Sequence, residues 1–168
     1  ALDLGSSGYR FKDLYLSGGI HLGGTGAANK LDDYEEGTFT VTFGATASNP
    51  TSTTGGTTGH YVKVGSLVMF RFHISNSNIS GGSGVPRVVG LPFLSATSSG
   101  WSAVTLGYRS CAGGVVPAAA MVQNNSSVIR FWRHASSSAQ SDTSSDLSLG
   151  NVGSSMDWYI AGSYYTDD

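Results

Sequence analysis

The sequence predicts an all-β protein, an antiparallel β-sandwich or jelly-roll-like knob preceded by a short, glycine-rich, extended segment. Glycine supplies 24 of the 168 residues, and each glycine inside a helix costs about 1 kcal/mol. Charged residues make up 12% of the chain, compared with about 25% in typical soluble domains. Several segments also alternate apolar and polar residues with the period of two that a half-buried strand requires.

A charged stretch, LDDYEEG at residues 31–37, separates two kinds of sequence. The preceding residues offer a short strand at Tyr9–Leu16 and a strand–turn–strand pattern in LYLSGGIHLGGTG, residues 14–26. Two strands alone are marginally stable. We therefore predict an extended segment at residues 1–30 that packs on the rest of the chain or on its own copies, and a β-domain at residues 31–168.

The clearest strands flank Gly65–Ser66, where a two-residue turn predicts a hairpin of residues 59–64 and 67–74. In the second strand one face is entirely apolar and is the predicted core face: Val68, Phe70, Phe72 and Ile74. Before this hairpin we expect a strand at 38–43 and a polar loop at 44–59. After it we expect strands at 85–91, 101–108, 115–122, 128–134, 147–149 and 156–165, with no helix.

The opposite face of the second hairpin strand carries Leu67 and Met69. Apolar side chains on a face that points away from the core indicate a contact with another subunit. The carboxylates of the charged stretch lack the spacing of a calcium-binding loop. We expect Asp33 and Glu36 to meet basic groups across the same subunit boundary, for which Lys30 or Arg10 would serve.

A second outward row is expected in the strand VIRFWRH, where Ile129 and Phe131 point inward. Arg130, Trp132 and His134 then point outward, and Trp101 lies opposite the apolar face of its own strand. Flat aromatic side chains can pack on sugar rings, but such a row can equally form a subunit contact, and the sequence leaves both open. The candidate ligand- or receptor-binding residues are Trp101, Arg130, Trp132 and His134.

No catalytic constellation emerges from the sequence. There is no G-x-S-x-G motif, the four histidines have no metal-ligand spacing, and no two carboxylates are paired by their positions. The single cysteine, Cys111, is expected to be structural. We therefore expect no enzyme activity, no metal and no cofactor. A net charge of −2 argues against nucleic acid, and no apolar run approaches the length of about 20 residues that a membrane helix needs.

Several landmarks resemble the C-terminal region of tail-fibre and related appendage proteins of tailed bacteriophages, especially marine and cyanobacterial phages. They are the segment LGSSGYRFKDLYLSGGIHLGGTGAANKLDDYEEGTFTVTF, followed by GHYVKVGSLV, GLPF and a closing IAGSYYT. In these proteins the glycine after the two glutamates is usually followed by Thr-Trp-Thr-Pro. Here Phe39 and Val41 take the places of the tryptophan and the proline. Both positions stay apolar, so the strand pattern is kept, but a role specific to that tryptophan does not carry over to this chain.

The resemblance implies a structural virion protein exposed to the extracellular medium, in which a homotrimeric fibre carries a knob that binds a host-surface glycan or protein. It implies other virion proteins as partners and brings no catalytic residue. Because the sequence starts at Ala1, we expect a processed product or part of a longer polypeptide. The alternatives are a capsid- or neck-attached fibre or decoration protein with a purely architectural role, and a polysaccharide depolymerase.

Overall fold

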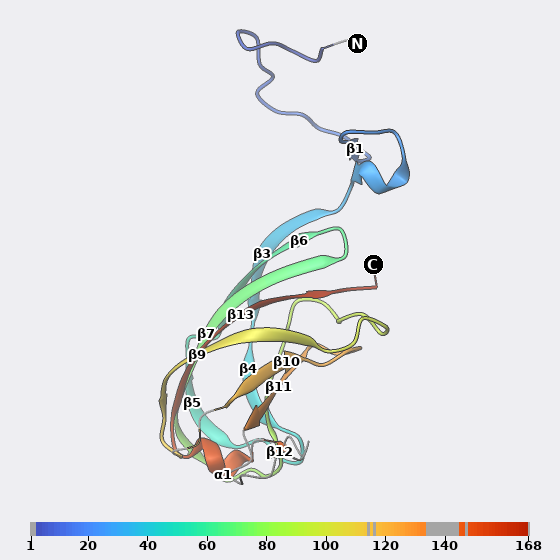
Figure 1. The fold of residues 1–168 in the computed structure, drawn as a ribbon. Helices are drawn as coiled ribbons and strands as arrows, with labels where there is room; N and C mark the ends of the chain where they lie inside the picture. The colour runs from blue at the N-terminus through green and yellow to red at the C-terminus, as the bar shows by residue number, and fades with distance from the viewer. Residues whose placement is uncertain (1–2, 114, 116, 134–144, 147, 168) are drawn as a thin grey trace. The chain divides into compact units, whose positions relative to one another are not determined.

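A computed structural model describes residues 3–113, 115, 117–133, 145–146 and 148–167, except for the side chains of 145 and 146. The chain divides into two units, Ala1–Asp33 and Tyr34–Asp168 (Figure 1). The sequence analysis placed this division after residue 30. We call them the N-terminal unit and the β-domain, and each is described by itself.

The N-terminal unit contains one pair of two-residue strands. β1 (Ile20–His21) pairs with β2 (Lys30–Leu31) in antiparallel register, and a 3-10 helix at Ala27–Asn29 lies between them. The expected strand at Tyr9–Leu16 is wrong: no strand forms there. Neither face of that segment is cleanly apolar, so it has no core side on which to pack. No described residue of this unit is buried.

In the part of the β-domain that the structure describes, there are eleven strands and one short helix. They are β3 (Tyr34–Thr40), β4 (Thr42–Ala45), β5 (Thr51–Gly55), β6 (Thr58–Val64), β7 (Leu67–Ser80), β8 (Pro86–Val89), β9 (Ser102–Cys111), β10 (Ala119–Val122), β11 (Val128–Arg133), β12 (Ser145–Asp146), α1 (Leu149–Val152) and β13 (Met156–Tyr165).

The strands form one antiparallel sheet in the order β3-β6-β7-β13-β9-β10-β11-β8-β4, with β5 paired to β7 and β12 paired to β11. The two ends of this path, β3 and β4, are separated in sequence by Val41 alone. The sheet therefore curls until it nearly closes, and its two halves face each other across a common core (Figure 1). This confirms the all-β, sandwich-like fold expected from the sequence.

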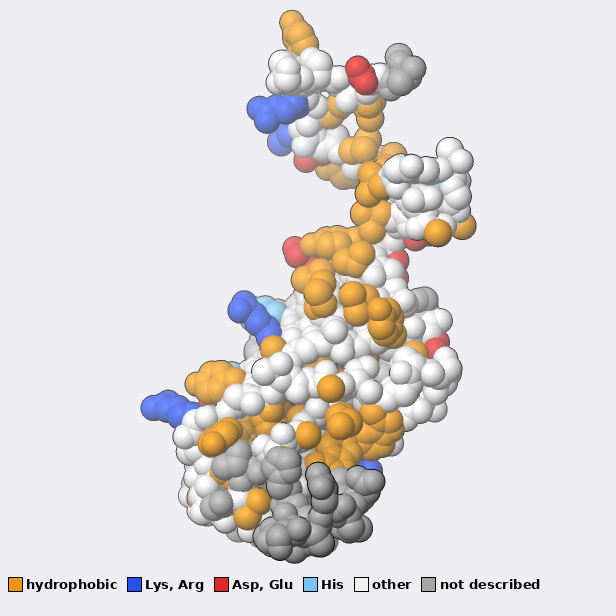
Figure 2. Space-filling view, in the orientation of Figure 1, with side chains coloured by type: hydrophobic (Ala, Val, Ile, Leu, Met, Phe, Trp, Pro, Cys, Tyr) orange, Lys and Arg blue, Asp and Glu red, His pale blue; other side chains and the backbone are white. Residues whose placement is uncertain are grey.

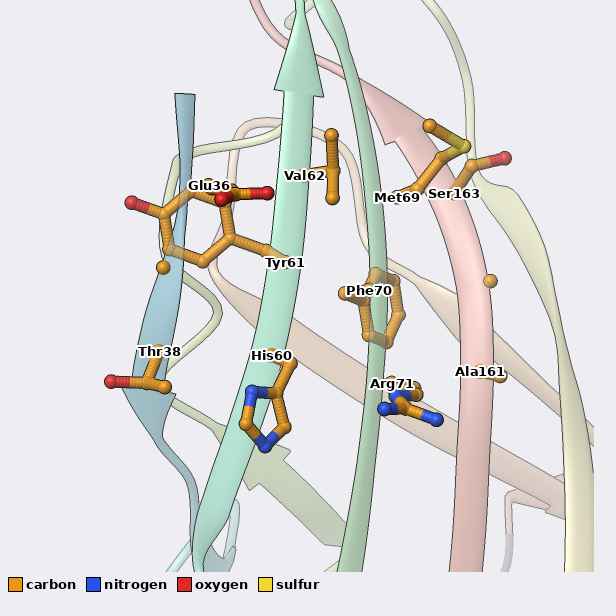
Figure 3. A pocket seen from close by; sticks show the side chains of 12 residues that line it. Glu36, Thr38, His60, Tyr61, Val62, Met69, Phe70, Arg71, Ala161 and Ser163 are labelled. Carbon is orange, nitrogen blue, oxygen red and sulfur yellow. The ribbon is translucent and has the colours of Figure 1, made fainter. Parts of the chain in front are cut away.

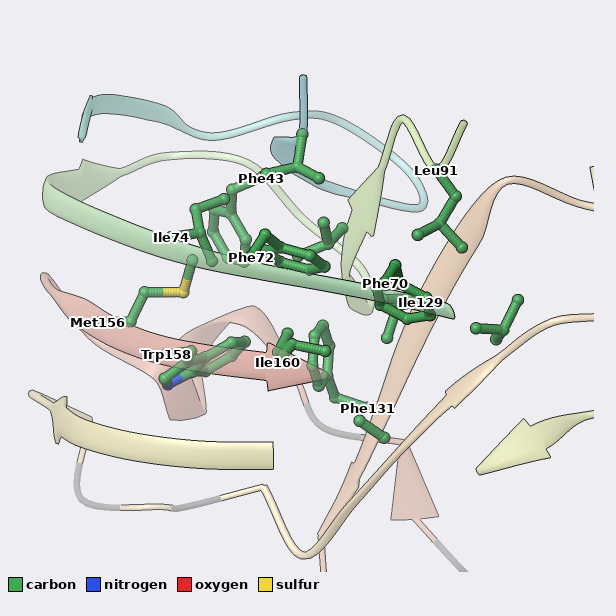
Figure 4. Packing of buried hydrophobic residues seen from close by; sticks show 14 of the residues in the cluster. Phe43, Phe70, Phe72, Ile74, Leu91, Ile129, Phe131, Met156, Trp158 and Ile160 are labelled. Carbon is green, nitrogen blue, oxygen red and sulfur yellow. The ribbon is translucent and has the colours of Figure 1, made fainter. Parts of the chain in front are cut away.

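The predicted hairpin faces are confirmed. Gly65 adopts a φ of +55°, the left-handed conformation that tight hairpin turns favour at a glycine, and Val64 lies opposite Leu67. The inward residues of β7 are all buried, from Val68 to Ile74. On β13, Trp158 is fully buried, and its ring centroid lies 4.7 Å from that of Phe131. Side chains from both halves of the sheet fill the space between them (Figure 4).

Three local expectations are wrong. The expected loop at 44–59 contains β5, a strand of threonine, serine and glycine that pairs with the second half of β7. The expected strand at 147–149 is replaced by α1, because the Asn151 side chain accepts a hydrogen bond from the Ser148 backbone N–H (3.1 Å) and starts a helix. Leu147 lies outside the described residues. The strand expected from Val115 begins at Ala119.

Candidate functional site

Three of the four predicted receptor-binding residues lie together on the outer face of the sheet. The ring centroids of Trp101 and Trp132 are 5.2 Å apart. The guanidinium carbon of Arg130 lies 5.6 Å from the Trp101 centroid and 5.9 Å from the Trp132 centroid. We call these three residues the tryptophan–arginine cluster. The fourth predicted residue, His134, lies outside the described residues.

Strand register explains why these residues meet. Arg130 and Trp132 are two positions apart on β11, so they share a face. On the neighbouring strand, Ala119 lies opposite Trp132, and this small residue leaves room for the indole ring. Trp101 immediately precedes β9, the strand on the other side of β10, and is 39% exposed. The cluster combines aromatic surface with guanidinium donors, and each cation–π contact at an exposed site contributes about 0.5–1 kcal/mol.

The predicted subunit-contact residues lie on the outer face of another part of the sheet, formed by β3, β6, β7 and β13. Leu67 is in register with Val64 and Tyr165, and Val64 is in register with Tyr34. These four residues form a row of apolar and aromatic side chains, which we call the apolar row. Tyr34 is 60% exposed and Tyr165 is 53% exposed.

A second row runs beside the apolar row and contains Glu36, Val62, Met69 and Ser163. The sheet thus brings Glu36, Leu67 and Met69 to one face, whereas Asp33 belongs to the N-terminal unit. The Tyr34 hydroxyl donates a hydrogen bond to Glu36 (3.0 Å), and this bond raises the pKa of Tyr34. Glu36 therefore has a partner within its own chain.

The same outer face is hollowed at the Met69 row and beyond it, a feature that the sequence analysis missed. Two adjoining hollows share His60, Arg71 and Ala161 in their linings and have volumes of about 790 and 580 Å³. Figure 3 shows His60 and Arg71 side by side on neighbouring strands. The predicted hairpin was enough to bring these two residues together, because a two-residue turn at Gly65–Ser66 places His60 opposite Arg71.

A polar and aromatic group borders the smaller hollow. The rings of His73 and Tyr159 are stacked with centroids 4.4 Å apart and planes 12° apart. His73 Nε2 lies 2.5 Å from Asp157 Oδ1, and Arg109 Nη1 lies 3.7 Å from Asp157 Oδ2. The Asp157 carboxylate therefore contacts both a guanidinium and the imidazole ring.

Metal binding and catalysis by a pair of carboxylates both require ionisable side chains that lie close together. In the described part of the chain, no three histidines, cysteines or acidic residues are grouped to hold a metal ion. Three strand spacings, about 14 Å across the sheet, separate β3 from β13. Asp157 also lies six residues along β13 from Ser163, the residue in the same row as Glu36, which adds about 20 Å along the strand. Paired glycosidase carboxylates lie about 5 to 10 Å apart. Burial raises the pKa of the Cys111 thiol, which disfavours the nucleophilic thiolate.

Among the described residues, no helix is long and apolar enough to cross a bilayer. Comparisons of the chain with protein-family models, with curated proteins and with solved structures found no match.

Proposed function

We propose that this chain is a structural virion protein of a tailed phage, the distal part of a fibre that assembles as a homotrimer and recognises carbohydrate on the host surface. In this proposal the N-terminal unit joins the copies and the β-domain is the knob. The observation that carries it is the N-terminal unit, which exposes apolar side chains and has no core of its own.

Hydrophobic side chains are visible on the surface of the N-terminal unit in Figure 2. Among its described residues, nine large hydrophobic ones are exposed: Leu4, Tyr9, Phe11, Leu14, Tyr15, Leu16, Ile20, Leu22 and Leu31. Each fully buried side chain of this kind contributes about 1.5–3 kcal/mol, and a single two-stranded pair cannot supply that burial. Packing among copies of the same segment provides it without a second protein. This is the arrangement that the fibre-like sequence landmarks imply.

The apolar row gives further support for assembly. Tyr34, Val64, Leu67 and Tyr165 form a continuous strip across four strands, and patches of this kind mark interaction sites when they are contiguous. Tyr34 directly follows the N-terminal unit in the chain. The strip can therefore form part of an interface between copies.

The tryptophan–arginine cluster supports carbohydrate recognition over a purely architectural role. Two indole rings and a guanidinium lie within 6 Å of one another on the outside of the sheet, where a structural role in the core does not explain them. Aromatic rings present apolar faces to the C–H groups of a sugar, while the guanidinium donates hydrogen bonds to its hydroxyls. The separation of Glu36 and Asp157 gives no support to a depolymerase.

Light scattering of the full chain tests the assembly. We expect a mass three times that of the monomer at micromolar concentration, because the exposed side chains of residues 3–33 are then buried between copies. A stable monomer would contradict the proposal.

Binding to an array of bacterial surface polysaccharides tests recognition. For any glycan that binds on the array, Trp132→Ala should weaken binding about two- to ten-fold, since an aromatic contact contributes about 0.5–1.5 kcal/mol, and should leave the melting temperature nearly unchanged. Tyr108→Ala is the matched control, because this exposed aromatic residue makes no ring contact with the cluster. Loss of folding in Trp132→Ala, or equal binding by both variants, would contradict this role.

A further inference from the structure

The hollow on the outer face of β6, β7, β13 and β9 follows from one cross-strand row of residues. His60 is in register with Arg71, Arg71 with Ala161, and Ala161 with Thr105. Two large side chains are thus followed by two small ones across adjacent strands. The floor of the hollow is open because Ala161 and Thr105, together with Gly107 two positions along β9, do not fill it.

In the described part of the chain, the positive charge of Arg71 in this hollow has no negatively charged side chain as a partner. Among the residues that the structure describes, neither Arg71 nor His60 has an ion pair or hydrogen bond with another side chain. The nearby carboxylate of Asp157 already contacts His73 and Arg109, and Glu36 lines the larger hollow but not the smaller one. A guanidinium at the centre of a concave surface is well suited to a carboxylate, which it can bind through two parallel hydrogen bonds.

An aromatic platform lies next to this guanidinium. His73 is two residues along β7 from Arg71, a separation of about 7 Å, and its ring stacks on that of Tyr159. The contact with Asp157 fixes the orientation of the imidazole. Tyr159 is 47% exposed, so ring surface remains open beside the hollow. A single sugar ring can bridge the distance from Arg71 to this platform.

We propose that the hollow binds an acidic saccharide, with a uronate carboxylate at Arg71 and His60 and the sugar ring over Gly107 and Thr105 against the His73–Tyr159 pair. The volume of about 580 Å³ in the smaller hollow is within the usual range of ligand pockets, about 300–1,000 Å³. The site is separate from the tryptophan–arginine cluster and does not depend on it. A neutral saccharide can offer hydroxyl groups to Arg71 but supplies no charged partner for it.

Titration of the full-length protein with trigalacturonate, and with a neutral galactose trimer as comparison, tests this site by calorimetry. We expect the acidic trimer to bind and the neutral one to bind at least about ten-fold more weakly, because a hydrogen bond to a charged group contributes about 1.5–3 kcal/mol. Added salt should weaken the acidic complex.

Two variants locate the binding. Arg71→Gln should weaken trigalacturonate binding at least about ten-fold, whereas Arg10→Gln, the same change of charge at an exposed position of the N-terminal unit, should leave it unchanged. Gly107→Val should also abolish it by filling the hollow. A Cβ at Gly107 would meet the Tyr159 Cβ at 3.6 Å, an ordinary contact, and an unchanged melting temperature of this variant would show that it keeps the fold.

Trp132→Ala should leave trigalacturonate binding intact. The proposal is overturned if the wild-type protein does not bind the acidic trimer, or if it binds both trimers equally. Binding that survives in Arg71→Gln would also overturn it, as would binding that is lost in Trp132→Ala alone, because the ligand would then occupy the tryptophan–arginine cluster.

Discussion

The N-terminal unit and the β-domain are both rich in glycine and aromatic residues, yet only one of them has a core. Phe11 in the N-terminal unit is 64% exposed, whereas Phe72 on β7 is 6% exposed. The difference lies in the number of strand partners. β7 pairs with β6 and β5 along one edge and with β13 along the other, so its inward face is covered by other side chains. An aromatic side chain becomes core only when the surrounding strands supply an opposing layer.

Replacing each of these phenylalanines separately with alanine should give the largest difference in stability between the two units. Phe72→Ala should lower the free energy of unfolding by about 3 to 5 kcal/mol, because it leaves a cavity beside Phe39 and Phe70. Phe11→Ala should change the unfolding of the β-domain by less than about 0.5 kcal/mol. Urea denaturation followed by tryptophan fluorescence measures both, and equal losses would show that Phe11 is part of the same core.

The buried Tyr164 of the β-domain and the exposed Tyr15 of the N-terminal unit should also differ in how they affect stability at alkaline pH. The Tyr164 hydroxyl donates to the Phe93 carbonyl oxygen (3.0 Å) and accepts from the Phe93 N–H (3.2 Å). Burial of this side chain raises the pKa of Tyr164 to about 12. A pKa raised above the unfolded value of about 10 stabilises the fold below pH 10, and this stabilisation is lost as the pH rises from about 10 to 12.

Wild-type stability should therefore fall by about 2 kcal/mol over that interval from this group. Tyr164→Phe should remove this part of the fall and should cost about 1 kcal/mol at neutral pH, since its hydrogen bonds are lost. Tyr15→Phe, at an exposed position, is the control and should retain the wild-type profile. Thermal melting at pH 8, 10 and 11 measures the effect, and identical profiles for all three proteins would rule out Tyr164 as the cause.

The smallest effect on stability is expected where the two units join. Asp33→Lys combined with Glu36→Lys should weaken the trimer while leaving the melting temperature of the β-domain nearly unchanged, because Glu36 is exposed and its bond to Tyr34 is on the surface. Sedimentation over a range of concentrations measures the assembly. An unchanged dissociation constant would mean that these carboxylates lie outside the interface.

The predictable part of the fold is the part in which alternation and turn chemistry agree. On β7 the apolar residues at even positions and the turn at Gly65–Ser66 together fix both faces and the register with β6. β5 could not be predicted from its own residues, because Thr51–Gly55 has no apolar face and is a strand only through its pairing with β7. The Tyr9–Leu16 segment shows the converse, since weak alternation without a partner produced no strand.

The same limit applies to the binding surfaces. The outward direction of Arg130 and Trp132 follows from the inward direction of Ile129 and Phe131. Their contact with Trp101 depends on the placement of β10 between β9 and β11, which no local pattern indicates. The pairing of His60 with Arg71 was implicit in the hairpin, but Tyr159 reaches the hollow only because β13 lies beside β7.

The position of β13 also has a consequence for the order of folding. This strand contains some of the last residues of the sequence, Met156–Tyr165, yet it lies in the middle of the sheet between β7 and β9. Before a ribosome has released these residues, β7 and β9 have no common partner and the buried face around Trp158 stays open. The domain can therefore complete its fold only after synthesis of its C-terminal strand, and loss of that strand would divide the sheet in two.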